Sequence, residues 1–381
     1  MKTQKIKEVK KNLIRLPTPS NISYLWNIGS ILAICLGLQI ITGVMISIQF
    51  STNLLSTFEQ VIIISRNITR GWPLRILHTL GATLFFVFIF THIRRNLWIN
   101  SPKTKQKTWI TGIVILLLTI ITAFLGYVLP WGQISFWGAT VITNILSAIP
   151  YLGKRAVTWL WGNFSVRQPT LNRFFSLHFL IPIVIAILSL IHLIRLHSTG
   201  SSTTTSNITI MEKTSFHPYF SAKDTTPLLL IILTSIWVIT HIPYSTLDPE
   251  NFIEANPLST PTHIQPEWYF LFAYAILRAI PSKLGGVLAL IASILVFMLP
   301  IITKKSIRTT KFKPTKKLKL WSILAIILIL TWIGANPVED PYVKTGQVTR
   351  TIFFLIMILA INCFLNKIKP WKFNKESFLE N

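Results

Sequence analysis

Long apolar stretches alternate with short charged connections along almost the whole chain. Eight stretches nearly free of charge are each about 17 to 24 residues long, close to the roughly 20 residues that a helix needs to cross a bilayer. They cover 27–50, 76–98, 109–130, 174–197, 226–243, 284–303, 319–335 and 350–366. The alternating strands of a membrane barrel are not visible. The pattern therefore predicts an all-α integral membrane protein with eight transmembrane helices.

Composition and charge narrow the class of protein. Hydrophobic residues make up 51% of the chain and charged residues only 13%, whereas soluble domains carry about 25% charged residues. The net charge of +25 alone would suit a nucleic-acid-binding protein, but such a protein does not need this much apolar surface. We therefore expect a lipid membrane and no nucleic acid as partner. Cys35 and Cys363 both lie in apolar stretches and predict no disulfide framework.

The basic residues predict how the chain crosses the membrane. With eight spans both termini lie on one side, which collects 26 of the 37 Lys and Arg residues, against 11 on the other side. Such an asymmetry is typical of a cytoplasm-like or matrix-like side for both termini. Residues 1–15 predict a surface helix there, with a targeting presequence as the alternative. The long connections 131–173 and 244–283 lie on the less positive side, and we expect them to fold into lids.

Four of the eight histidines lie within predicted spans, in two pairs with the same spacing. His78 and His92 belong to the second span, His178 and His192 to the fourth, and both gaps are 14 residues. Fourteen residues make about 3.9 helical turns, so the two histidines of each span share one helix face. The two spans cross in the same direction. We therefore expect His78 to be level with His178, and His92 to be level with His192 near the positive surface.

Two facing imidazoles at one depth can hold a planar metal cofactor, and the pattern predicts two such sites stacked across the bilayer. Iron in a porphyrin accepts two axial ligands from the protein. Because no Cys-x-x-Cys-His motif occurs, we expect two non-covalent b-type haems. One alternative is four polar residues satisfied inside a helix bundle. Another is bare zinc, which needs three or four ligands, and no carboxylate lies at these positions.

Glycines repeat the 14-residue spacing. Gly29 and Gly43 lie in the first span, and Gly112 and Gly126 in the third. Glycine lets a bulky group approach the backbone, so these four glycines predict clearances for two flat rings. The alternative is ordinary packing of small residues between membrane helices.

Three arginines lie at the ends of the histidine helices. Arg75 precedes His78, Arg95 follows His92, and Arg173 stands just before the fourth span. Each can pair with a haem carboxylate, or can serve as an ordinary interfacial charge that sets the topology.

These features resemble a known family. The paired histidines, the run from Gly126 to Gln133 and the tetrad from Pro266 to Tyr269 are similar to cytochrome b of the respiratory cytochrome bc1 complex, from about Pro17 to about Leu365. One fused chain resembles the mitochondrial or proteobacterial form. The resemblance implies a di-haem four-helix domain over 1–210 and a C-terminal domain over 211–381. It also implies the mitochondrial inner membrane, with both termini in the matrix.

The resemblance also implies an activity and partners. Ubiquinol is oxidised near the outer surface, one electron passing to an iron–sulfur (Rieske) subunit and on to cytochrome c1. The other electron crosses by the His78/His178 haem and the His92/His192 haem to reduce quinone near the matrix surface, with proton translocation. The chain is expected to act only within the complex, as a catalytic subunit of a dimeric quinol–cytochrome c reductase.

Glu267 is the one acid in the otherwise neutral stretch 255–277. Apolar flanks would raise the pKa of its carboxyl group and suit it to accept a proton from quinol, although a capping or surface acid is the alternative. The resemblance implies an outer quinol site made of Gly138, Ile142, Pro266, Glu267, Phe270 and Tyr274.

Near the positive surface, His197 ends the fourth span and Lys223-Asp224 precedes the fifth. A histidine and an aspartate could hydrogen-bond the two quinone carbonyls and deliver protons on reduction. Asp224 could instead cap the fifth helix. The resemblance implies an inner quinone site made of Trp26, Ser30, His197, Ser201, Phe216, Lys223 and Asp224. Arg94 departs from the family, which usually has a small residue beside His92.

Two other functions compete with this interpretation. A di-haem membrane anchor would carry haems without an outer quinol site, and Glu267 with its tetrad argues against it. A cofactor-free proton-coupled transporter would use His and Glu relays and show no haem absorbance. The repeated 14-residue spacings of His and Gly argue against that transporter.

Overall fold

The structure, a computed structural model, describes residues 14–201, 212–302 and 314–365. The N-terminal surface helix expected over 1–15 lies almost wholly outside this part. The expected domain boundary between residues 210 and 211 and the chain after residue 365 also lie outside it.

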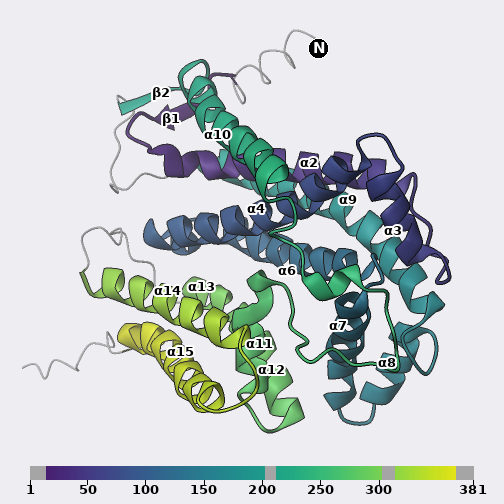
Figure 1. Cartoon of the computed structure of the whole chain (residues 1–381). Helices are drawn as coiled ribbons and strands as arrows, with labels where there is room; N and C mark the ends of the chain where they lie inside the picture. Colours follow the sequence, from purple (N-terminus) through teal and green to yellow (C-terminus); the bar gives the residue numbers. More distant parts are fainter. Residues whose placement is uncertain (1–13, 202–211, 303–313, 366–381) are drawn as a thin grey trace, which may run out of the picture.

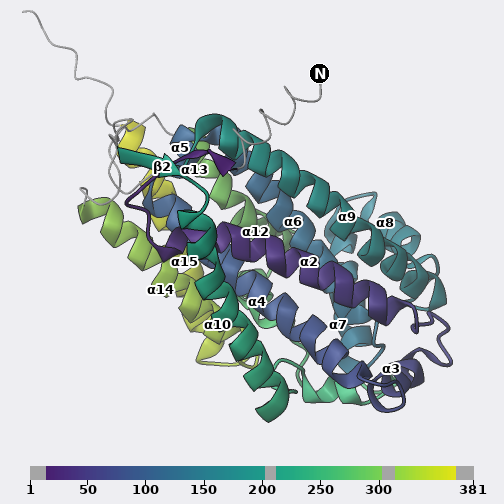
Figure 2. The ribbon, with the colours of Figure 1, turned by 90° about the horizontal axis from the view of Figure 1, so that it is seen from above.

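Long helices dominate the described part and lie side by side (Figure 1, Figure 2). A helix pairs its backbone N–H and C=O groups within one segment, which makes it one of the two structures that can cross hydrocarbon. They are α2 (Ile28–Ser47), α4 (Gly71–Trp98), α6 (Gln106–Val128), α9 (Gln168–Thr199), α10 (Tyr219–His241), α12 (Lys283–Leu295), α14 (Pro314–Gly334) and α15 (Tyr342–Leu365).

The prediction of an all-α membrane protein is confirmed. Within the described residues, seven helical segments are long and apolar enough to cross a membrane, by length and composition. They correspond to the first seven predicted spans, the sixth continuing from α12 through the short η7 (Val296–Met298) into α13 (Leu299–Ile302). The eighth predicted span, 350–366, falls on α15, whose side chains from residue 359 onward lie outside the described part.

One end of the helix array is covered by short elements (Figure 1, Figure 2). The connection 131–173 folds into α7 (Gln133–Asn144), η3 (Ile145–Ala148) and α8 (Gly153–Trp161). The connection 244–283 contains η5 (Pro249–Phe252), η6 (Trp268–Phe270) and α11 (Leu271–Arg278). The expectation that these connections form folded lids is confirmed. They lie at the end that also carries α3 (Thr57–Arg66).

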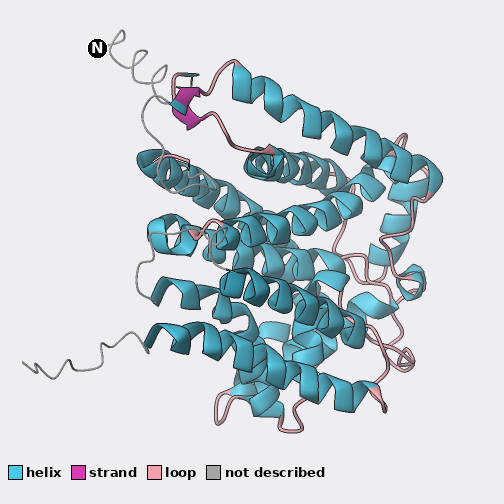
Figure 3. Cartoon of the chain, turned by 90° about the vertical axis from the view of Figure 1, so that its left-hand side faces the viewer, coloured by secondary structure: helices cyan, strands magenta, loops and turns pink. Residues whose placement is uncertain are grey.

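The opposite end carries a two-stranded ladder (Figure 3). β1 (Pro17–Pro19) pairs antiparallel with β2 (Lys213–Ser215), Thr18 lying opposite Thr214. The N-terminal segment and the connection between the fourth and fifth spans therefore meet at one surface, as the predicted topology requires. The short elements η2 (Tyr24–Asn27) and α5 (Ser101–Thr104) complete the described secondary structure.

The start of α10 differs from the prediction. The helix begins at Tyr219, so Lys223 and Asp224 lie inside its first turns and do not precede it. Charged residues at a helix end can stand in the membrane interface, so the apolar stretch underestimates the helix. Pro227 has no N–H to donate to the carbonyl of Lys223. Nδ2 of Asn27 donates to that oxygen instead, at 2.8 Å, which ties the start of α2 to α10.

A buried cluster joins the two halves of the chain. Trp109 and Ile113 of α6 pack with Ile276 of α11, Leu330 of α14 and Phe353 of α15. Nε1 of Trp109 donates to the carbonyl of Phe297 at 2.9 Å, which satisfies a buried indole N–H. By contrast, only 6% of the apolar windows of α9 and α10 is buried inside the chain. Those two helices therefore present their apolar surface to lipid or to other protein.

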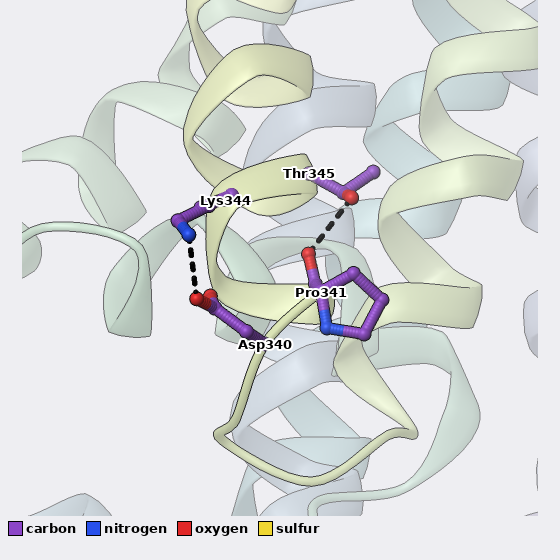
Figure 4. A network of polar contacts seen from close by, with 4 residues as sticks. All are labelled: Asp340, Pro341, Lys344 and Thr345. Carbon is purple, nitrogen blue, oxygen red and sulfur yellow. Dashed lines mark hydrogen bonds and ion pairs between the residues drawn. The ribbon is translucent and has the colours of Figure 1, made fainter.

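Local polar contacts connect the residues at the start of α15 (Figure 4). Asp340 and Lys344 form an ion pair of 2.8 Å, one helical turn apart. Oγ1 of Thr345 donates to the carbonyl of Pro341 at 2.9 Å. Exposed ion pairs contribute little to stability, so the packing of apolar side chains, such as Phe353 in the buried cluster, holds α15 in place.

Candidate functional site

The structure brings the four intramembrane histidines together in two pairs. The ring centroids of His78 and His178 are 6.3 Å apart, and those of His92 and His192 are 6.5 Å apart. Two nitrogen–metal bonds of about 2 Å and two imidazole radii of about 1 Å together span about 6 Å. Each pair therefore has the separation that one metal ion between two imidazoles needs.

Hydrogen bonds orient His78 and His178, which we call the outer pair. Nδ1 of His178 donates to the carbonyl oxygen of Thr122 at 2.8 Å. Nδ1 of His78 lies 2.8 Å from Oγ1 of Thr42, whose own hydroxyl donates to the carbonyl of Leu38 at 2.7 Å. The threonine oxygen must then accept from the imidazole. Both rings therefore carry their proton on Nδ1 and keep Nε2 as the metal-binding atom.

In the inner pair, His92 and His192, a described hydrogen bond orients the ring of His192 but not Nδ1 of His92. Nδ1 of His192 lies 3.2 Å from Oγ1 of Thr111, and this hydroxyl donates to the carbonyl of Thr108 at 2.9 Å. In the described part of the chain, Nδ1 of His92 is buried without a hydrogen-bond partner. Among the described residues no group of three or more His, Cys, Asp or Glu side chains could hold a bare metal ion. Two histidines without a third ligand therefore fit the iron of a porphyrin better than a zinc ion.

Each of the four spaced glycines faces one of the four histidines. A Cβ atom would lie 3.1 Å from His78 at Gly43 and 2.9 Å from Nδ1 of His178 at Gly126. It would lie 3.2 Å from His192 at Gly112 and 3.8 Å from His92 at Gly29. The first and third spans therefore leave room for the imidazoles of the second and fourth spans.

A cavity of about 300 Å³ surrounds the outer pair. Both histidines line it, together with Arg75, Gly43 and Gly126. Its size is within the range of pockets for small molecules and cofactors. Pro182 of α9 also lines it, and because proline lacks an N–H it releases the carbonyl of His178 from the helix ladder.

The three arginines have different surroundings. Nη1 of Arg75 donates to Oγ of Ser65 at 3.1 Å while the side chain lines the cavity. Nη2 of Arg95 donates to Oδ1 of Asn96 at 2.9 Å, and its guanidinium lies 5.3 Å from the ring centre of Trp26. Arg173 instead donates to the carbonyls of Trp159 and Leu160 on α8. Arg75 and Arg95 thus remain the cations beside the histidine pairs.

A second, smaller cavity of about 30 Å³ lies under the lids. All six residues expected at the outer quinol site line it: Gly138, Ile142, Pro266, Glu267, Phe270 and Tyr274. The hydroxyl of Tyr274 donates to the carbonyl of Ile264 at 3.3 Å. Residues from α7 and from the loop before η6 therefore form one pocket, although they are more than 120 positions apart in the chain.

Glu267 lines both cavities. Burial and, as the smaller cause, the negative charge of Asp248 together raise the pKa of its carboxyl group to about 7. A carboxyl group with this pKa can take up and release protons near neutral pH. Its place on the wall shared by the two cavities suits transfer of a proton from one cavity to the other.

The residues expected at the inner site are only partly brought together. Oγ of Ser30 on α2 donates to the carbonyl of Asn27 at 2.7 Å, and the carboxyl group of Asp224 on α10 lies beside this hydroxyl. Nζ of Lys223 donates to the carbonyl of Ile22 at 2.6 Å. Phe216 stacks on Phe220 with ring centres 6.1 Å apart. His197 is half-buried at the end of α9, and Ser201 closes the first described segment. The described contacts connect neither His197 nor Ser201 to Asp224.

Sequence reasoning missed the groups that orient the histidines. Thr42 and Thr111 each stand immediately before one of the spaced glycines, so a Thr-Gly pair in two spans was an available signal. The carbonyl of Thr122 left no signal, because a backbone acceptor has no residue type. Tyr127 and Tyr269 line both cavities; they belong to the two motifs of the resemblance, but sequence reasoning assigned them no role in a site.

Comparison with known proteins gives consistent matches. A family model described as cytochrome b/b6/petB matches residues 13–200, and one described as cytochrome b (C-terminal)/b6/petD matches residues 254–354. A solved chain titled "Hyperthermophilic respiratory Complex III" superimposes with a TM-score of 0.89 and 27% sequence identity. The match covers 96% of this chain and 98% of that chain.

Proposed function

This chain belongs to the cytochrome b family and is a subunit of a respiratory complex, and from that premise we propose that it oxidises ubiquinol on one side of the membrane and reduces quinone on the other. The two b-type haems bound by the histidine pairs supply one-electron carriage between the two quinone sites. The observation that carries the proposal is the pair of 6.3 and 6.5 Å imidazole separations.

The residues of the haem sites bind and orient. His78 and His178 would hold the outer haem through Nε2, because their Nδ1 protons are engaged by Thr42 and by the Thr122 carbonyl. His92 and His192 would hold the inner haem. Arg75 and Arg95 would compensate the haem carboxylates, and Gly29, Gly43, Gly112 and Gly126 leave space for the four imidazoles.

The outer quinol site is the pocket bounded by Gly138, Ile142, Pro266, Phe270 and Tyr274. Quinol releases two protons and two electrons on oxidation. Glu267 accepts one of these protons, since its pKa of about 7 makes it a base that is also able to release the proton again. One electron leaves to the iron–sulfur (Rieske) partner and then to cytochrome c1.

The inner quinone site is formed by Asp224, Ser30, Lys223 and Trp26, with His197, Ser201 and Phe216 nearby. Asp224 and His197 deliver protons to the quinone as it is reduced. Proton release at the outer surface and uptake at the inner surface together translocate protons. The N-terminal domain, 1–210, carries the haems, and the C-terminal domain, 211–381, carries Glu267 and its tetrad.

The proposed membrane and orientation have two sources. Positive residues gather on the side of both termini, 26 of 37, which is typical of a cytoplasm-like or matrix-like side. The resemblance to the mitochondrial form makes this the matrix side of a mitochondrial inner membrane in our proposal. The exposed apolar faces of α9 and α10 suit contact with lipid and with the second copy in a dimeric complex. A tag at either terminus should be protected from protease in intact mitoplasts, and digestion there would reverse the orientation.

The decisive experiment is a redox-titrated visible spectrum of the purified complex. Two b-type transitions at different potentials, with two haems per chain, would support the proposal. Well-folded complex without haem would overturn it. Quinol–cytochrome c reductase activity, measured on the same preparation, separates the proposal from a di-haem membrane anchor. The anchor would show both haems and no activity that depends on Glu267.

A further inference from the structure

Two cations lie buried at the positive-side end of the inner histidine pair. Lys105, directly before α6, is only 8% exposed, and its ammonium group donates to the carbonyl of Gly200. Arg95 is largely buried, and its Nε has no hydrogen-bond partner among the described atoms. Within the described residues the ion pair present is Asp340–Lys344, far along the chain, so neither cation has a carboxylate partner there.

Both cations lie close in the sequence to residues of the inner histidine pair or to residues that face it. Lys105 lies seven residues before Gly112, which is two helical turns on nearly the same face, and Gly112 faces His192. Gly200, the acceptor for Lys105, comes eight residues after His192 on α9. Arg95 comes three residues after His92 on α4. From the level of the inner histidines, Arg95 along α4, Lys105 along α6 and Gly200 along α9 all lie toward the positive surface.

Two buried positive charges next to each other are unfavourable without an anion. Burial and, as the smaller cause, the charge of Arg95 together lower the pKa of Lys105 to about 8. An unpaired buried cation is unfavourable, and the carbonyl of Gly200 supplies a dipole but no charge. The site therefore calls for a ligand with negative oxygen atoms between α4 and α6.

We propose that Lys105 and Arg95 together bind the two carboxylates of the inner haem, with Lys105 as the second cation of that site. The inference rests on the proposed haem function. The two propionates of a haem lie on one edge of the ring, and the two cations lie on one side of the His92/His192 pair. Reduction lowers the positive charge of the iron by one, so a nearby cation favours the reduced form and raises the potential of the inner haem.

The test compares three variants of the intact complex. Lys105→Met removes the charge with little change of length, and Lys105→Arg keeps the charge. Lys107→Met changes an exposed lysine two residues away. In redox titrations we expect Lys105→Met to lower the equilibrium constant for reduction of the inner haem by on the order of tenfold. This corresponds to a reduction potential lower by about 59 mV for one electron. The outer haem should not shift, and Lys105→Arg and Lys107→Met should behave like the parent.

Each other outcome counts against a particular claim. Two haems in the parent with an unshifted inner potential in Lys105→Met would overturn the role of Lys105 and leave the proposed function intact. An equal shift in Lys107→Met would mean a general surface-charge effect, which also overturns it. Absence of both haems in the parent would overturn the proposed function itself.

A lipid phosphate is the other source of negative oxygen atoms. The parent and Lys105→Met complexes are therefore titrated in vesicles of neutral phosphatidylcholine and in vesicles that also contain an anionic phospholipid. The same shift in both vesicles supports binding to the haem carboxylates. A shift that appears only with the anionic lipid would assign Lys105 to lipid and overturn the proposal.

Discussion

Gly126 faces the imidazole of His178 so closely that a Cβ atom there would lie 2.9 Å from Nδ1. At Gly29 the nearest atom of His92, Cε1, would lie 3.8 Å from a Cβ atom, which is an ordinary van der Waals contact. The glycine that faces His178 from the third span therefore tolerates a methyl group less well than the glycine that faces His92 from the first span. The difference arises because the outer histidine is held against α6 by its bond to the Thr122 carbonyl.

A methyl group at Gly126 should therefore disturb the outer haem. In Gly126→Ala we expect His178 to move from its axial position, with loss or a large potential shift of the outer b-type transition. Gly29→Ala is the matched control and should retain both transitions. The measurement is haem content per chain with a redox-titrated spectrum. Equal behaviour of the two variants would contradict the clearance argument.

Removing one inner ligand should remove one haem. His192→Leu removes one of the two imidazoles that would hold the inner haem, and we expect the inner transition to disappear while the outer transition stays. His217→Gln, a change of an exposed histidine, should leave both. Retention of both haems in His192→Leu would disprove the pairing with His92.

The pH dependence of quinol oxidation should follow Glu267. Its pKa is raised to about 7, so the carboxyl group is already protonated below pH 7 and cannot accept a proton. Turnover should therefore rise with pH through about 7 in the parent. In Glu267→Gln turnover should be lower, by about 10²- to 10⁴-fold if the group is the general base, and flat over that range.

The control for this change is Glu250→Gln, an exposed acid in the same connection between the fifth and sixth spans. It should keep the parental pH profile. Both haems should remain in both variants, since neither acid is a ligand. An unchanged profile in Glu267→Gln would remove this residue from the proton path.

The inner site should depend on Asp224 independently of the outer site. In Asp224→Asn the carboxylate that Ser30 contacts is lost, so proton delivery to quinone should slow. We expect slower reoxidation of the inner haem by added quinone, measured by stopped-flow absorbance, with both spectra unchanged. Asp340→Asn, which breaks only an exposed ion pair, should reoxidise at the parental rate. Equal rates in both variants would exclude Asp224.

Arg94 has a partner that its position beside His92 does not suggest. Its guanidinium lies 4.8 Å from the ring centre of Trp321, and four residues along each helix Nζ of Lys317 lies 5.6 Å from the ring centre of Trp98. The cation and the aromatic residue exchange helices between the two contacts. Together they join α4, which carries His78 and His92, to α14 in the C-terminal half of the chain.

A double-mutant cycle should detect this contact. Arg94→Met and Trp321→Leu should each destabilise the complex, with a coupling energy of about 0.5–1 kcal/mol, the usual value at exposed sites. The free energy of unfolding in denaturant is the measurement. Strictly additive losses would show that the two side chains do not interact.

The sequence by itself determined the membrane helices and the relative heights of the histidines. Both follow from short-range rules, namely the length of an apolar stretch and the period of the α-helix, which hold whatever the helix packs against. The helix ends were less certain, as at α10, where Lys223 and Asp224 extend the helix beyond its apolar stretch. The family resemblance added residues that no local rule selects, such as Gly138 and Ile142.

Only the tertiary structure decided which groups surround these residues. Thr42 and the carbonyl of Thr122 orient the outer histidines, Glu267 stands on the wall of two cavities, and Lys105 is buried against Gly200. Each contact joins helices far apart in the chain, and it depends on how each helix is rotated and how deep it sits against its neighbours. Side-chain packing over the whole bundle sets that rotation and depth, and no stretch of sequence contains this information alone.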